Sequence, residues 1–290
     1  MQVKQALYII SVLIAVLSVI ATSFGLFYSD GGEAYTFINQ YGDAVTIFGN
    51  GLYKHDSLFM APIFKGTDCA ILFIGVPALI IALLLDYRRN STGTKLFLTA
   101  ILALFAYYST SVAFGVTYNF LHLIYIGLFG LSFFGLIIGI SQIQFNNKIT
   151  LSRKGINIFL IISGIALFVA WLPDILASLA NGRSLALIEV YTTEITYVLD
   201  MGLISPLCFV CIYLLNKEKR LGYILLAIML TVGIFVGFMV IVQTLFQIHY
   251  DIALPAAALI TKVGIFSLLA IVAFYFEVKL FKAIKQSANP

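Results

Sequence analysis

Eight stretches of mostly apolar residues recur along the chain, and each is long enough for a helix to cross the ~30 Å hydrocarbon core of a bilayer. Because unpaired backbone groups are costly in lipid, stretches of this length predict helices. They cover approximately residues 6–27, 69–85, 96–116, 120–140, 156–172, 198–215, 221–246 and 256–276. The sequence therefore predicts an all-α, polytopic transmembrane helix bundle of about eight spans, forming a single integral membrane domain over residues 1–290, with longer structured extracytoplasmic loops at 28–68 and 174–197.

Composition excludes the other broad classes. Apolar and aromatic residues make up 61% of the chain and charged residues 10%, with a mean hydropathy of +1.04, whereas soluble domains have about 25% charged residues. The 25 phenylalanines and 16 tyrosines are too many for a disordered chain, and three cysteines are too few for a disulfide scaffold. The first apolar run exceeds the roughly 7 to 15 residues of a signal-peptide core, so it is interpreted as a retained membrane anchor.

The charged residues predict an orientation. With both termini inside, the inner segments contain 13 of the 17 lysines and arginines, while ten of the 13 acidic residues lie outside or at the outer boundary. A basic excess in short loops marks the cytoplasmic side. We therefore expect a multi-pass protein of the bacterial inner (cell) membrane with both termini in the cytoplasm.

The first outer loop contains a turn signal. The segments 44–48 and 52–54 flank Gly49-Asn50-Gly51 and together predict a small hairpin. An interfacial helix over residues 58–64 is the alternative. An aspartate followed by a proline recurs at Asp68 and Pro77 and at Asp200 and Pro206, which suggests two four-span halves in parallel orientation.

Ionisable residues at membrane depth are expensive and are candidates for function. Lys262 is placed roughly 10 Å below the outer end of the last span. Asp68 and Asp200 are placed at helix N-termini, where they either cap free backbone N–H groups or form a cation or proton site. Lys262 then serves as a counter-ion or proton relay to them, or else extends to the interface or forms a buried pair that only fixes packing.

Tyr118, Asn119 and His122 are the predicted hydrogen-bonding walls of this site, because they form the outer turn between the third and fourth spans. His122 lies one helical turn from Asn119, so the two side chains share a helix face. The alternative is that this lone histidine is an ordinary hydrogen-bonded core residue. His55 and Asp56 add an imidazole and a carboxylate to the first outer loop, but their spacing matches no metal motif.

Other motifs favour packing over chemistry. Cys208 and Cys211 form a C-x-x-C deep in the sixth span, without a basic or helix N-terminal environment that would lower a thiol pKa. Phosphate-binding, dinucleotide-binding and nucleophile-elbow motifs are absent from the sequence. No metal, no cofactor, no catalytic residue and no nucleic-acid partner are expected.

Several strings resemble a family of uncharacterised bacterial multi-spanning integral membrane proteins, over roughly residues 50 to 225. They are Leu52-Tyr53-Lys54-His55-Asp56-Ser57, the segment 68–77, the segment 111–119 with Tyr125 after it, and the segment 199–206. The resemblance implies a single integral domain in a bacterial cell membrane and brings no established activity. It adds Tyr53 to the outer-loop candidates His55 and Asp56.

Three functions are compatible with these features. The first is binding or transport of a small solute or cation at an outer-third site. The second is a non-catalytic membrane partner or sensor that binds a protein through its outer loops. The third, a membrane-embedded oxidoreductase or lipid-modifying enzyme, is the least favoured.

Overall fold

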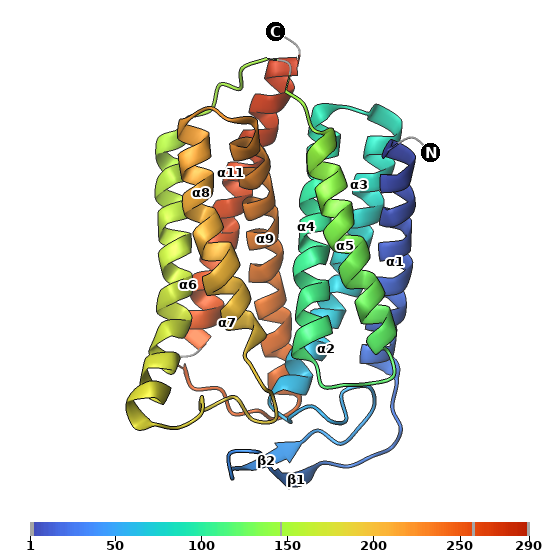
Figure 1. Ribbon diagram of the computed structural model, residues 1–290, viewed down its shortest axis with the longest axis vertical. Helices are drawn as coiled ribbons and strands as arrows, with labels where there is room; N and C mark the ends of the chain where they lie inside the picture. Colours follow the sequence, from blue (N-terminus) through green and yellow to red (C-terminus); the bar gives the residue numbers. More distant parts are fainter. Residues whose placement is uncertain (1–2, 146, 257–258, 289–290) are drawn as a thin grey trace.

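The computed structural model describes residues 3–145, 147–256 and 259–288, and of these the side chains of 261, 262 and 288 are not described. Long helices run side by side, and a two-stranded sheet lies at one end of the bundle (Figure 1). The α-helices are α1 Val3–Phe27, α2 Met60–Ala70, α3 Val76–Arg89, α4 Thr92–Gly115, α5 His122–Gln142, α6 Arg153–Asn181, α7 Ile195–Leu199, α8 Ser205–Asn216, α9 Arg220–His249 and α11 Ile265–Ala288. The π-helices are η1 Ile71–Gly75, η2 Asp200–Ile204 and η3 Leu259–Gly264, and the strands are β1 Tyr35–Ile38 and β2 Ala44–Ile47.

Seven helical segments among the described residues are long and apolar enough to cross a membrane. They are 3–27, 60–89, 92–115, 122–142, 153–181, 195–216 and 220–249. The predicted helical bundle is thus confirmed. The last predicted span falls on η3 and α11, which packs along α9, and the total of eight spans stays a prediction.

Both termini lie at one end of the bundle, here called the terminal end, and the sheet lies at the other, the hairpin end (Figure 1). The terminal end contains the connections between α3 and α4, α5 and α6, and α8 and α9. These are the short connections in which the sequence has its basic excess. The assignment of the terminal end to the cytoplasm stays a prediction.

Two helix boundaries differ from the prediction. The second span begins at Met60, so the first long loop is 28–59, and α6 continues to Asn181, which shortens the other long loop to 182–194. The low hydropathy of the segment with Lys65, Gly66 and Asp68 placed the first turns of α2 outside the predicted span. In the structure these three residues are buried, and α2 packs against α1 and α9, so the segment is helical despite its two charged side chains.

The predicted hairpin has the wrong partner strand. β2 pairs antiparallel with β1, with Tyr35 opposite Ile47, and not with residues 52–54. The turn forms at residues 39–43 because the Asn39 side chain accepts hydrogen bonds from the backbone N–H groups of Tyr41 and Asp43, both at 2.9 Å. Gly49 does have the expected positive φ of 78°, but there it allows close approach to the backbone of Glu33.

The long helices form two groups, and in each group one helix packs against the helix before it and the helix after it in the chain. In the first group α4 packs against α3 and α5, and in the second α9 packs against α8 and α11. The groups meet along α4 and α9 (Figure 1), while α2 also packs on α9 and α7 contacts α4. Pro77 and Pro206 each occupy the second position after a π-helix, η1 and η2 respectively. The features that correspond between the halves are therefore the π-helix and the proline, because Asp68 precedes η1 whereas Asp200 begins η2.

Candidate functional site

Asp68 lies inside the first helix group and is 1% exposed. Its carboxyl oxygens accept hydrogen bonds from the hydroxyl groups of Tyr53, at 2.5 Å, and Tyr108, at 3.1 Å. Helix α1 passes so close at Gly25 that a Cβ there would lie 1.8 Å from an Asp68 oxygen. Asp68 is the ninth residue of α2, so the interpretation of this side chain as a helix N-cap is wrong.

Lys65 supplies the positive charge next to Asp68. It precedes Asp68 by one turn on α2, is 7% exposed, and interacts electrostatically with that carboxylate. Its ammonium group donates hydrogen bonds to the carbonyl oxygens of Gly25, at 2.9 Å, and Leu26, at 3.3 Å. These carbonyls end α1, where the helix dipole favours a cation. The first group thus contains a buried lysine one turn before a buried carboxyl group, without a salt bridge between them. The predicted loop 28–68 did not anticipate this, because it includes Lys65.

Asp200 belongs to the second group and is 5% exposed. Its carboxyl oxygens accept hydrogen bonds from the Tyr107 hydroxyl, at 3.1 Å, and from the indole N–H of Trp171, at 2.9 Å. It begins η2 and follows five helical residues, so it is not an N-cap either.

Consecutive tyrosines of α4 therefore reach the two carboxyl groups. Tyr107 bonds to Asp200 and Tyr108 to Asp68. Neighbouring positions on an α-helix diverge by about 100°, so the two acids lie on different sides of α4. The expected common pocket is replaced by two hydrogen-bonded sites joined through one helix.

A cavity of about 70 Å³ adjoins Asp200. Its lining is almost wholly apolar and comes from α4, α6, η2, α8, α9 and α11; the polar exceptions are Asp200, Tyr107 and Ser163. The Ser163 hydroxyl is buried and has no hydrogen-bond partner among the described residues. Since a water molecule takes about 30 Å³ of liquid volume, the cavity has room for one or two small molecules beside the carboxyl group.

The three predicted wall residues do not share one environment. Asn119 is buried and its side-chain oxygen accepts a hydrogen bond from the backbone N–H of Leu121, at 3.0 Å, which fixes the start of α5. Tyr118 is 77% exposed and its ring lies 5.4 Å from that of His122. The side chain of Lys262 lies outside the described residues, so its expected pairing with Asp68 or Asp200 stays a prediction.

The candidate residues of the first long loop also differ in exposure. His55 is exposed, whereas Tyr53 and Asp56 are fully buried. One Asp56 oxygen accepts hydrogen bonds from the backbone N–H of Thr117, at 2.9 Å, and from the hydroxyl of Tyr191, at 3.0 Å. Its other oxygen is buried without a partner among the described residues. Burial raises the pKa of Asp56 to about 7.

Further contacts join the two long loops around Asp56, and we call this set of contacts the loop clamp. The side-chain amides of Asn39 and Gln40 donate to the carbonyl oxygens of Glu189, at 2.8 Å, and Tyr191, at 3.1 Å, and the Ser57 hydroxyl donates to the Glu189 carboxylate. Burial, together with the negative charge of Glu194, raises the pKa of Glu189. The clamp thus contains two carboxyl groups whose pKa values are raised by burial.

Asp56→Asn is expected to change how stability depends on pH. The pKa of Asp56 is about 7 in the folded protein and about 3.9 when unfolded. The contribution of Asp56 to the free energy of unfolding is therefore fully present below about pH 4. It is lost as the pH rises to about 7, and the total loss is up to about 4 kcal/mol. Asparagine can accept both existing hydrogen bonds without a charge. Thermal unfolding in detergent should find Asp56→Asn more stable than wild type above pH ~7, with a weaker remaining slope from Glu189.

The exposed residue Glu33 provides the control, since Glu33→Gln removes one acidic charge at the same end of the bundle. This variant should keep the wild-type pH profile. An unchanged profile in Asp56→Asn would contradict the assignment.

Comparison of the chain with protein-family models, curated proteins and solved structures found no match. The resemblance to a bacterial membrane-protein family therefore stays a prediction. The many apolar helices fit a membrane-embedded protein.

Proposed function

We propose that the protein binds a small cation, a proton included, at the carboxyl group of Asp200 and moves it across the membrane. The observation that carries the proposal is a buried carboxyl group, in a segment apolar enough to span a membrane, held by two neutral donors beside a cavity. A carboxylate buried without a counter-ion is costly and is stabilised by a proton or a bound cation. Acids at membrane depth commonly mark such pathways.

The surroundings of Asp68 and Asp200 differ in charge. Neither acid forms an ion pair among the described side chains, but Lys65 lies one turn before Asp68 and interacts electrostatically with it, whereas the two groups that bond to the Asp200 carboxyl group are neutral. Asp200 is therefore proposed as the exchangeable site, and Asp68 with Lys65 as the fixed support of α1 and α2. Lys262 is retained as a proposed counter-ion or relay.

The proposal includes an eight-span protein of a bacterial inner membrane, with both termini in the cytoplasm. In this orientation the hairpin end and its long loops face outward, and Asp200 lies in the outer part of its span. The repeated packing order of the two helix groups supports a transporter, because parallel repeats are common in transporter folds.

Trp171 allows a direct test, because it is the only tryptophan in the chain and its indole bonds to Asp200. Protonation of Asp200, or binding of Na⁺, K⁺ or tetramethylammonium there, is expected to shift Trp171 emission in the purified protein. Asp200→Asn should remove the shift, and Glu33→Gln should keep it. Proteoliposomes loaded with a pH dye should show the same pattern in gradient-driven flux.

Two outcomes would contradict the proposal. One is wild-type emission that does not respond to pH or to any of these cations. The other is a response that persists unchanged in Asp200→Asn.

A second candidate, binding of a protein partner on the outer face, is favoured by one observation. All four residues of β1 are exposed, among them Tyr35, Phe37 and Ile38, and an exposed apolar edge strand is a template for pairing with another chain. In a strain that depends on this protein, Phe37→Ser should then abolish function and Asp200→Asn should preserve it. The cation proposal expects the reverse.

A further inference from the structure

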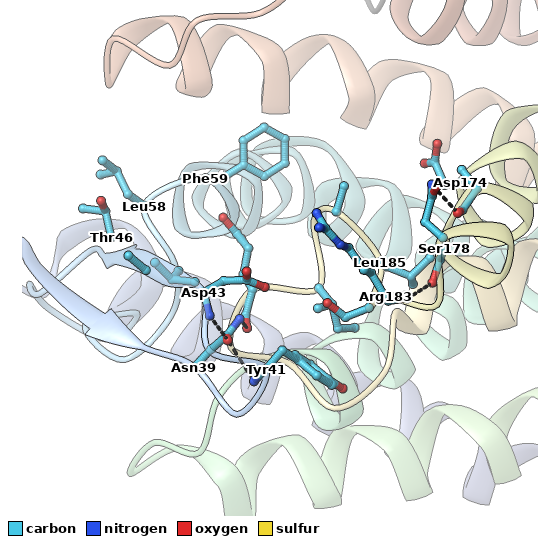
Figure 2. A pocket seen from close by; sticks show the side chains of 18 of the residues that line it. Asn39, Tyr41, Asp43, Thr46, Leu58, Phe59, Asp174, Ser178, Arg183 and Leu185 are labelled. Carbon is cyan, nitrogen blue, oxygen red and sulfur yellow. Dashed lines mark hydrogen bonds between the residues drawn. The ribbon is translucent and has the colours of Figure 1, made fainter.

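A second cavity lies at the hairpin end, apart from the cavity at Asp200. It has a volume of about 1300 Å³ and lies between the β-hairpin, the last turns of α6 and the connection from α6 to α7. Figure 2 shows Asn39, Tyr41 and Asp43 on the hairpin side, and Asp174, Ser178 and Arg183 on the α6 side. The cavity is thus formed by the two long loops that the loop clamp joins.

Opposite charges line this cavity without pairing. Arg183 lies on the α6 side, and Asp43 and Glu189 also line the cavity. The ion pairs found among the described residues are Lys54–Asp30, Lys148–Glu218 and Arg153–Glu218. Arg183 and Asp43 are therefore held more than a salt-bridge distance apart across shared space, which leaves room for a ligand with both charges.

Hydrogen bonds fix the backbone beneath both groups. Gly182 ends α6 with a positive φ of 59°, and the Arg183 N–H donates to the carbonyl oxygen of Ser178, at 3.2 Å. The Ser178 hydroxyl donates to the Arg183 carbonyl oxygen, at 2.5 Å. On the other side the Asp43 N–H is bonded to the Asn39 side chain. The backbone positions of Arg183 and Asp43 are therefore fixed by hydrogen-bonded turns.

We propose that this cavity binds a short zwitterionic peptide, with its C-terminal carboxylate on Arg183 and its N-terminal ammonium on Asp43. A guanidinium group recognises a carboxylate through paired N–H donors, and the exposed carboxylate of Asp43 is the complementary partner for an ammonium group. Leu58, Phe59 and Leu185 provide apolar contacts for side chains. The volume exceeds the roughly 300 to 1000 Å³ of ordinary small-ligand pockets, which favours an oligopeptide over a free amino acid. This inference does not depend on the proposed cation site.

The test is calorimetric titration of the purified full chain with tetra-alanine, its C-terminal amide, its N-acetyl form and free alanine. Tetra-alanine is expected to bind saturably, and amidation or acetylation should each weaken binding about tenfold to a hundredfold, as expected when a charged hydrogen bond is lost. Arg183→Gln should weaken tetra-alanine binding by the same factor as amidation and should not weaken binding of the amide further. Asp43→Asn should weaken tetra-alanine binding by the same factor as N-acetylation and should not weaken binding of the N-acetyl peptide further.

Lys54→Gln is the matched control, because Lys54 is a cation of the same end that pairs with Asp30 and does not line the cavity. It should leave tetra-alanine binding unchanged, and unchanged thermal unfolding should show that each variant is folded. Absence of saturable binding would overturn the proposal, as would equal weakening of tetra-alanine and its amide by Arg183→Gln. Free alanine binding as tightly as the peptide would overturn the assignment to peptides.

Discussion

Lys65→Met is expected to lower the free energy of unfolding by about 3 to 5 kcal/mol, the cost of leaving a buried charge without a compensating one nearby. Methionine retains most of the apolar stem but leaves the Asp68 carboxylate without its cation. It also removes the donor to the carbonyl oxygens of Gly25 and Leu26. Equilibrium unfolding in detergent, followed by Trp171 emission and circular dichroism, measures the change.

A double-mutant cycle separates the charge effect from packing. Asp68→Asn retains acceptors for Tyr53 and Tyr108 but has no charge, so adding it to Lys65→Met should restore much of the lost stability. The exposed pair Lys54–Asp30 is the control, and Lys54→Met should cost less than about 1 kcal/mol. Equal losses in Lys54→Met and Lys65→Met, or no recovery in the double variant, would show that Lys65 does not balance Asp68.

Gly66→Ala is expected to cost about 3 kcal/mol or to prevent accumulation of the folded protein. A Cβ at this position would lie 2.5 Å from Cα and 2.8 Å from the backbone nitrogen of Gln243 on α9. Backbone atoms cannot rotate away as a side chain can, so α2 and α9 would have to separate. Their separation would also break the hydrogen bond from Gln243 to the Thr67 hydroxyl, at 2.7 Å. Yield after purification and the thermal unfolding temperature measure the effect.

Gly233→Ala is the matched control on α9. The nearest atom to a Cβ there is the Cβ of Ala273, at 3.9 Å, which is an ordinary contact. This variant should gain up to about 1 kcal/mol from helix propensity. If Gly66→Ala and Gly233→Ala behave alike, α2 and α9 do not pack as closely as described.

The helices could be predicted from the sequence because hydropathy directly reports the need to bury apolar surface or expose it to lipid. The boundary at Met60 could not, because Lys65 and Asp68 are polar and become buried only through contact with other helices. The boundary at Asn181 could not, because Pro173 and Asp174 usually end a helix, yet α6 continues through them with exposed last turns. The spacing of Lys65 and Asp68 does contain a usable signal, since side chains three residues apart share a helix face.

The carboxyl groups of Asp68 and Asp200 could be identified from their depth, but their partners could not. Tyr53, Tyr108 and Trp171 reach these acids from other segments of the chain, and no local periodicity encodes such contacts. The same holds for the β-hairpin, where the Asn39 side chain fixes the turn and Gly49-Asn50-Gly51 does not. Arg183 carried no signal in the sequence because its significance lies in what faces it across the cavity.

The adjacent tyrosines of α4 have a mechanical consequence. Both hydroxyl groups are carried by one stiff cylinder, so a small turn of this cylinder about its long axis moves both in the same rotational sense. Such a turn cannot improve contact with one acid without altering contact with the other. A change in the hydrogen bond at Asp200 would thus alter the hydrogen bond at Asp68 with no ligand passing between them.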